Sequence, residues 1–129
     1  MNVRRLQPLR VAVAGPDRRF VRVTAFLLRR RGYDTMEGEL GHVVRDAERD
    51  RPDVVLLEAG ASRAAAARVL AQFAALPFTP GVILVTEDDL PWHGVATFTK
   101  WSSIEDVIAA VECAAAQRPV PRIVEAAQS

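Results

Sequence analysis

The chain predicts an α/β fold in which a parallel sheet is covered by helices on both faces. Five short apolar runs of strand length alternate with segments of helical period along the 129 residues. Two of these runs, residues 54–57 (VVLL) and 82–85 (VILV), are apolar at every position, which is typical of strands buried on both faces. Because strand–helix–strand crossovers are right-handed, this alternation favours a doubly wound, three-layer α/β/α sandwich.

The N-terminal quarter of the chain supplies the first strand and the first helix. Residues 9–14 (LRVAVA) form an apolar run that ends at Gly15 and Pro16. Asp17 is a residue type that caps helix N-termini, and Gly32 is a typical helix stop. Between them, an apolar stripe at helical spacing is expected to face the core, and it consists of Phe20, Val23, Phe26 and Leu27.

The middle of the chain continues the alternation. Residues 33–39 (YDTMEGE) are polar enough for a strand at the sheet edge, and residues 41–51 (GHVVRDAERDR) predict a weak helix. The buried strand at 54–57 follows. The alanine-rich segment 61–75 then predicts a helix by propensity, with a core stripe formed by Val69, Leu70 and Phe73.

The C-terminal part predicts two more strands and a last helix. Residues 82–85 and 95–99 are the strands. The helix after them has apolar residues at i, i+3, i+4, i+7 and i+11, namely Ile104, Val107, Ile108, Val111 and Ala115. Two prolines follow Gln117, so we expect one domain over residues 1–117 and a tail or linker over residues 118–129.

Composition excludes several classes of function. No apolar run is long enough to span a bilayer or follows the pattern of a signal peptide, and the single cysteine cannot form an internal disulfide, so we expect a cytoplasmic protein. His42 and His93 lack the spacing of a zinc site, and no phosphate-binding glycine loop or nucleophile–histidine–acid set is present. We therefore expect no metal, no cofactor, no small-molecule substrate and no enzymatic activity.

Charge is distributed unevenly. Residues 1–31 hold nine arginines and one acid, whereas the remaining 98 residues hold eight basic and fifteen acidic residues. Two interpretations remain open, a solvated helix face or a docking surface for an acidic partner or nucleic acid. We do not expect this domain alone to bind nucleic acid.

Four segments resemble the receiver domains of two-component response regulators. RVAVAGPDRRFVRVTAFLLRRRGYDT resembles the first strand and helix of that family, and RPDVVLLE resembles the strand that ends in the phosphoacceptor aspartate. VILVTEDD and TFTKWSSIEDVIAAV resemble the strands that carry the switch threonine and the invariant lysine. The resemblance covers residues 8–117 and implies a flavodoxin-like sheet with strand order 2-1-3-4-5.

The resemblance also implies where the family's phosphorylation site falls, and this sequence departs from it. The switch hydroxyl falls on Thr86 and the lysine on Lys100, but the Mg²⁺-binding acidic pair falls on Gly15 and Pro16, and the acceptor falls on Glu58. Mg²⁺ requires oxygen ligands, and neither a glycine nor a proline side chain offers one. Asp17 lies one position late, so we expect it to cap the helix rather than to bind metal.

Glu58 suggests a different use of this site. Its carboxylate reaches about as far as a phosphoryl oxygen would, so we hypothesise a direct ion pair between Glu58 and Lys100, with Thr86 donating to the carboxylate. Such a pair would hold the site in one conformation. The resulting hypothesis is a receiver-like module that acts by protein contact and without phosphorylation; the alternative is a phosphoaccepting receiver, such as that of a transcriptional regulator whose DNA-binding domain is not in this chain.

Two further departures concern the output surface. Trp101 replaces the proline that follows the lysine through a cis bond in the family, so we expect a trans peptide here. Only 13 residues separate Thr86 from Lys100, fewer than in the family, so the fourth helix should be shortened or missing. We expect a protein partner or a homodimer, and two interaction surfaces for it. One is the basic first helix with Arg18, Arg22 and Arg29, and the other is the reshaped edge near Trp92 and Trp101, through which a homodimer would form.

Overall fold

The structure is a computed structural model, and it describes residues 8–60, 62–87, 92 and 95–117. The strands are β1 (Arg10–Ala14), β2 (Asp34–Gly38), β3 (Val54–Glu58), β4 (Gly81–Thr86) and β5 (Ala96–Thr99). The helices are α1 (Arg18–Arg30), α2 (Val43–Asp50), α3 (Arg63–Ala74) and α4 (Ile104–Gln117). Each predicted strand and helix is therefore present, with boundaries that differ by a few residues.

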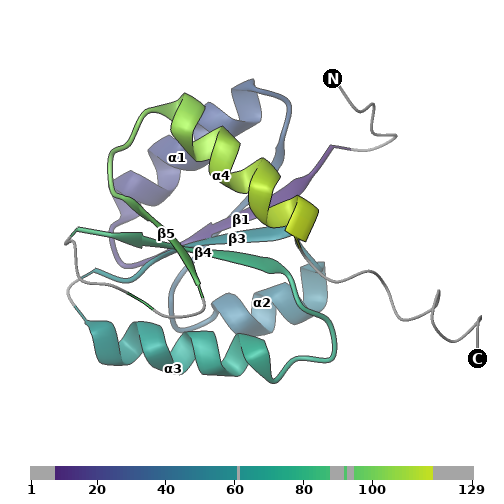
Figure 1. Cartoon of the computed structure of the whole chain (residues 1–129), viewed down its shortest axis with the longest axis vertical. Helices are drawn as coiled ribbons and strands as arrows, with labels where there is room; N and C mark the ends of the chain where they lie inside the picture. The colour runs from purple at the N-terminus through teal and green to yellow at the C-terminus, as the bar shows by residue number, and fades with distance from the viewer. Residues whose placement is uncertain (1–7, 61, 88–91, 93–94, 118–129) are drawn as a thin grey trace, which may run out of the picture.

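The five strands form one parallel sheet in the order β2-β1-β3-β4-β5. Helices α1 and α4 cover one face of the sheet and α2 and α3 cover the other (Figure 1). All five residues of the central strand β3 are buried, because that strand has a neighbour on each side and a helix layer on each face. The predicted three-layer, doubly wound sandwich with strand order 2-1-3-4-5 is confirmed.

Two hydrophobic clusters, one on each face of the sheet, form the core. The cluster under α1 and α4 contains apolar side chains from β1, β3 and β4 together with Phe20, Leu28, Val107 and Val111. The cluster under α2 and α3 contains Leu57, Leu84, Val69 and Phe73, among others. The core stripes predicted for α3 and α4 lie in these clusters, as expected. None of the described helices is long and apolar enough to cross a bilayer.

The face that α1 turns to the core differs from the prediction. Phe20 is buried as expected, but the rest of the buried face consists of Val21, Thr24, Ala25 and Leu28. Val23, Phe26 and Leu27 are exposed. Both sets satisfy helical spacing, so periodicity alone could not choose between them. The buried set includes the small side chains of Thr24 and Ala25, which let the helix approach the sheet closely.

The connection between β4 and β5 is short. Strand β4 ends at Thr86 and β5 begins at Ala96. Among the residues of this connection that the structure describes, 87, 92 and 95, none is helical. The described part of this connection thus contains no helix. The expectation that the family's fourth helix is shortened or missing also rests on residues 88–91, 93 and 94, which lie outside the described residues.

Candidate site at the carboxyl ends of the strands

The parallel sheet brings the predicted site residues to one edge. Gly15, Pro16 and Asp17 follow β1, Glu58 is the last residue of β3, Thr86 is the last residue of β4, and Lys100 follows β5. The backbone N–H of Lys100 donates to the carbonyl oxygen of Thr86 over 2.8 Å. This bond extends the pairing of β4 and β5 by one residue and so points the lysine toward the ends of the other strands.

The carboxylate of Glu58 is fully enclosed and accepts hydrogen bonds at both oxygens. The side chain is 1% exposed. The backbone N–H of Asp17 donates to Oε1 over 3.0 Å, and the backbone N–H of Gly60 donates to Oε2 over 2.6 Å. Burying a carboxylate is costly unless it is paired and hydrogen-bonded. The two loops that follow β1 and β3 therefore stabilise Glu58 by supplying one N–H group each.

Lys100 lies among three carboxylates but contacts one of them much more closely. Its Nζ atom is 2.6 Å from Asp17 Oδ2, and it is 3.9 Å from both Glu58 Oε2 and Glu87 Oε1. The direct Glu58–Lys100 pair expected from the sequence is therefore only the longer contact, and the close partner of the lysine is Asp17. The donation from Thr86 to the Glu58 carboxylate stays a prediction.

The two carboxylate oxygens of Asp17 contact different partners. Oδ1 accepts from the backbone N–H of Phe20 over 3.1 Å, which caps α1 as predicted. Oδ2 contacts Lys100. The hydrogen bond from Lys100, followed by that from the Phe20 N–H, lowers the pKa of Asp17. The sequence indicated the cap but not the ion pair, although a capping carboxylate uses one oxygen and leaves the other available.

The charge state of Lys100 follows from opposing effects. Burial lowers the pKa of Lys100, but the hydrogen bond to Asp17 and the negative charges of Glu58, Asp17 and Glu87 outweigh it, and the net pKa lies above the ordinary value. The lysine side chain is only 9% exposed. A cation is therefore held at this edge of the sheet, and the carboxylates around it compensate its charge.

Gly15 and Gly60 allow the loops to close over Glu58. A Cβ atom at Gly15 would lie 2.6 Å from Glu58 Oε1 and closer still to the Glu58 carbonyl oxygen, so no side chain fits at this position. Gly60 has a φ of +64°, which favours glycine, and a Cβ there would lie 3.0 Å from Pro16 Cγ. The site is thus closed by backbone that approaches Glu58 from two sides.

Lys100 also connects the site to Trp101. The lysine Nζ atom lies 5.7 Å from the centroid of the Phe20 ring, and the Phe20 and Trp101 rings meet edge to face with centroids 5.4 Å apart. No cis peptide bond occurs among the described residues, as expected for Lys100–Trp101, but Trp101 has a φ of +65°. The loop after β5 therefore has a trans Lys100–Trp101 peptide and a left-handed backbone conformation at Trp101.

The residues predicted to form an interaction surface do not lie together. Arg18, Arg22 and Arg29 are exposed on α1, and Trp101 precedes α4 on the same face of the sheet. Trp92 packs instead against the cluster under α2 and α3, with the Arg63 guanidinium 4.2 Å from its ring centroid. The edge expected to contain both tryptophans is therefore not formed, because the sheet separates Trp92 from Trp101, and the contact of the basic first helix with a partner stays a prediction.

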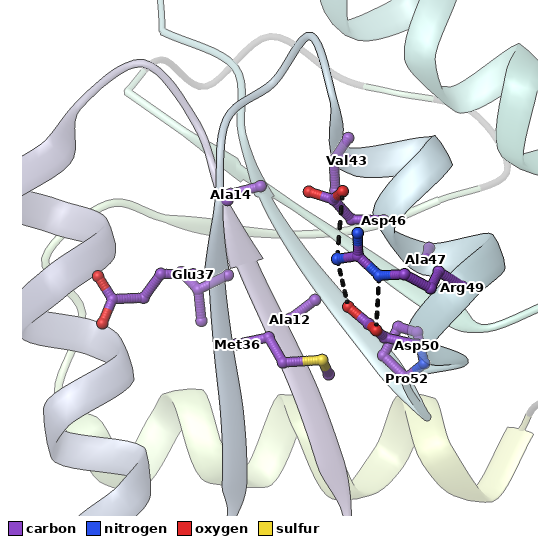
Figure 2. Close-up of a pocket in the computed structure, with 12 residues that line it drawn as sticks. Ala12, Ala14, Met36, Glu37, Val43, Asp46, Ala47, Arg49, Asp50 and Pro52 are labelled. Carbon is purple, nitrogen blue, oxygen red and sulfur yellow. Dashed lines mark hydrogen bonds and ion pairs between the residues drawn. The ribbon is translucent and has the colours of Figure 1, made fainter.

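A pocket lies away from this site, between α2 and the β1–β2 edge (Figure 2). Its free volume is about 50 Å³, far below the roughly 300–1,000 Å³ of small-molecule sites. Arg49 on its rim pairs with Asp50 over 3.0 Å and with Asp46 over 3.5 Å.

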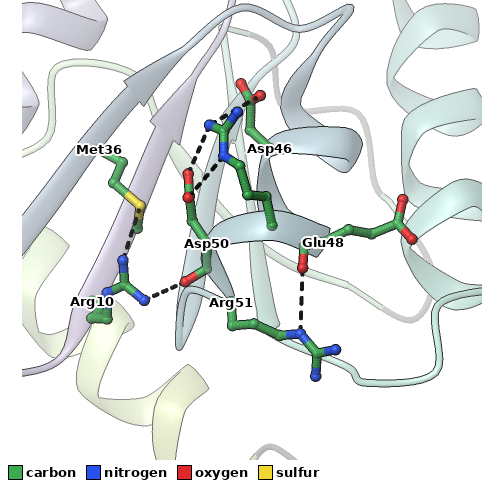
Figure 3. A network of polar contacts seen from close by, with 7 residues as sticks. Arg10, Met36, Asp46, Glu48, Asp50 and Arg51 are labelled. Carbon is green, nitrogen blue, oxygen red and sulfur yellow. Dashed lines mark hydrogen bonds and ion pairs between the residues drawn. The ribbon is translucent and has the colours of Figure 1, made fainter.

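The charges near this pocket belong to a polar network that joins α2 to the sheet (Figure 3). Arg10 of β1 donates to the carbonyl oxygen of Asp50, and its Nη2 atom lies 3.8 Å from the sulfur of Met36. These contacts tie the end of α2 to β1 and β2. The network is therefore structural and offers no second candidate site.

Searches of protein families and of curated proteins found no match to this chain. Solved structures do match. The FixJ-N structure has a TM-score of 0.78 at 17% identity, over 90% of this chain and 100% of that one. The signal receiver domain of the putative response regulator NarL from Mycobacterium tuberculosis has a TM-score of 0.72 at 20% identity, over 87% and 99% of the two chains.

A third match agrees with these two. A response regulator receiver domain protein from Bacillus halodurans has a TM-score of 0.69 at 15% identity, over 88% of this chain and 100% of that one. The three matches cover 99–100% of the length of each solved domain. This chain therefore has the fold of the response-regulator receiver domains.

Proposed function

We propose that this chain is a signalling module of the receiver type that works by protein–protein contact and without phosphorylation. The observation that carries the proposal is the enclosure of Glu58. Both of its oxygens accept backbone N–H groups, and its side chain is 1% exposed. A phosphoacceptor must present a carboxylate oxygen to an incoming phosphoryl group, and this carboxylate is turned into the protein instead.

The residues around Glu58 do not fit a divalent cation. Mg²⁺ requires near-octahedral oxygen coordination at short distances. Gly15 and Pro16 offer no side-chain oxygen, and Gly15 has no room for one. The Asp17 carboxylate is engaged by Lys100 and by the N-terminus of α1. Phosphoryl transfer depends mainly on positioning and on such charge stabilisation, so the arrangement supports a site that does not accept phosphate.

The Lys100 ammonium compensates the carboxylates of this site. It compensates Asp17 at 2.6 Å and lies within 3.9 Å of Glu58. In this proposal the cluster of Asp17, Glu58 and Lys100 is an internal substitute for the bound ion and the phosphoryl group of a receiver. The module would then be held in one conformation, and its partner would bind it constitutively.

The test is incubation of the full chain with acetyl phosphate and Mg²⁺, followed by intact mass spectrometry. We expect no adduct of about 80 Da, the mass that a phosphoryl group adds. A receiver domain known to accept phosphate from acetyl phosphate serves as the positive control. An adduct that peptide mapping places on Glu58 or Asp17 would overturn the proposal and support a phosphoaccepting receiver.

A further inference from the structure

The large apolar side chains that the described part of the chain leaves exposed lie on one face of the molecule. They are Val23 (36% exposed), Phe26 (51%) and Leu27 (37%) of α1, and Trp101 (55%), which precedes α4. A shallow groove between α1 and α4 joins Val23, Leu27 and Trp101, and Phe26 lies one helical turn from Val23. We call these four residues the α1 patch. A contiguous exposed apolar surface of this kind marks an interaction site.

The α1 patch is flanked by positive charge that the described residues neutralise only in part. Helix α1 contains five arginines and no acid. Arg18 and Arg29 pair with glutamates of the β2 region, Glu39 and Glu37. Arg19, Arg22 and Arg30 have no carboxylate partner among the residues that the structure describes. The Arg30 guanidinium lies 5.9 Å from the Phe26 ring centroid instead, so cationic and apolar groups alternate along this face.

We propose that the α1 patch docks an acidic amphipathic helix of a partner protein. This inference rests on the proposed function and names the chemistry of its partner. An apolar stripe on such a helix would cover Leu27 and Trp101, and its flanking carboxylates would meet Arg19, Arg22 and Arg30. The groove lies between two helices of one layer (Figure 1), and an amphipathic helix laid into an apolar groove is a recurring mode of recognition.

Other occupants fit these observations less well. Phosphates of a nucleic acid would pair with the arginines but would leave Phe26, Leu27 and Trp101 exposed to water. A second copy of this chain, docked through the same patch, would bring the basic α1 helices of both copies together, and like charges oppose such a contact. An acidic partner complements the apolar and the cationic groups at once.

The site at the strand ends also helps to set the α1 patch. Asp17 caps α1 and contacts Lys100, whose ammonium lies against the Phe20 ring, and that ring contacts Trp101. These contacts form an unbroken series from the Glu58 site to the exposed indole. Since no phosphoryl group is needed to complete the series, the patch is presented constitutively.

The experiment uses the full chain with Trp92→Phe, which leaves Trp101 as its only tryptophan. A synthetic helical peptide with a leucine stripe flanked by glutamates is titrated in parallel with the same peptide carrying lysine at each glutamate position. We expect the acidic peptide to bind saturably and to shift Trp101 emission to shorter wavelength. The lysine peptide should bind at least about tenfold more weakly, because charge complementarity governs partner choice.

Variants assign the binding to the patch. The double variant Arg19→Glu and Arg22→Glu should bind the lysine peptide more tightly than the acidic peptide. The double variant Phe26→Ser and Leu27→Ser should bind the acidic peptide about tenfold more weakly, or weaker still. Arg68→Glu is the matched control, because Arg68 is an exposed arginine on α3, on the opposite face of the sheet, and it should leave both affinities unchanged. All of these positions are exposed, so circular dichroism should show native folds.

Several results would overturn the docking proposal. These are equal affinity for the two peptides, no saturable binding of the acidic peptide, or binding that the patch variants leave unchanged. Duplex DNA or anionic vesicles that compete with the acidic peptide and bind more tightly would assign the patch to those ligands instead. The same preparations receive acetyl phosphate and Mg²⁺: an adduct overturns the proposed function alone, whereas failed peptide binding without an adduct overturns only the docking.

Discussion

Replacing Glu58 by glutamine tests whether its carboxylate is needed in the form that the structure shows. Glutamine has nearly the same shape, but one of its two terminal groups is an NH₂ donor. Both oxygens of Glu58 accept from backbone N–H groups, those of Asp17 and Gly60. Whichever way the amide is turned, its NH₂ group therefore faces an N–H donor, and two donors cannot bond to each other.

The magnitude follows from the hydrogen bonds that are lost. A hydrogen bond to a charged group contributes about 1.5–3 kcal/mol, and a buried donor left unsatisfied costs about 1–3 kcal/mol. The substitution also removes a buried charge, which offsets part of this loss. Lys100 keeps its 2.6 Å contact with Asp17 and is not left unpaired. We expect Glu58→Gln to lower the free energy of unfolding by about 2–3 kcal/mol.

Glu87→Gln is the matched control. Glu87 Oε1 and Glu58 Oε2 are both 3.9 Å from Lys100 Nζ, but the Glu87 side chain is 58% exposed whereas that of Glu58 is 1% exposed. An exposed charge at this distance contributes little, so this control should cost less than about 0.5 kcal/mol. Equilibrium unfolding in urea measures the stability loss of both variants. We expect a shift in the urea concentration at the unfolding midpoint, with an unchanged dependence of the unfolding free energy on urea concentration. If the two substitutions cost the same, the enclosure of Glu58 has no energetic consequence and the reasoning fails.

Two further predictions concern the residues beside Glu58. The pKa of Asp17 is lowered in the folded state. The contribution of the Asp17 carboxylate to stability is therefore present above its ordinary pKa of 3.8 and is lost as the pH falls through the lowered folded value. Asp17→Asn should be less stable than the wild type near neutral pH and should approach the stability of the wild type in strongly acidic solution, as measured by urea unfolding across that pH range. Gly15→Ala should destabilise the protein by several kcal/mol or prevent folding, since its Cβ would meet Glu58 backbone and side-chain atoms. Gly41→Ala is its control, because nothing lies within 4 Å of a Cβ there, and thermal unfolding should show it neutral or slightly stabilised; equal effects of the two substitutions would contradict the close approach at Gly15.

The sequence was sufficient for the sheet because its strands are distinctive. The runs at 54–57 and 82–85 are apolar throughout, and parallel pairing then places the residue after each strand at one edge. This is why Glu58, Thr86 and Lys100, which the family resemblance singles out, meet at one site. Their common position depends on topology, which is fixed by many residues at once.

The details that were missed depend on single choices that no pattern encodes. Two overlapping sets of α1 residues satisfy helical spacing, and only contact with the sheet buries the set with Thr24 and Ala25. The nearest carboxylate to Lys100 was likewise undetermined, because Asp17 and Glu58 both follow strands that end at the same edge. The choice depends on the loop at Gly15, which brings the Asp17 N–H to Glu58 and leaves Asp17 Oδ2 facing the lysine.

The departures at positions 15 and 58 meet at one close approach of the backbone. A Cβ at position 15 would meet the carbonyl oxygen and the Cβ of residue 58 as well as Glu58 Oε1. Shortening Glu58 to aspartate would remove only the contact with Oε1, so the backbone would still leave no room for an acid at position 15. Neither change alone could therefore rebuild a metal site. The loop after β1 approaches the end of β3 too closely for a side chain, and the two backbone N–H groups then hold the Glu58 carboxylate in the enclosed space.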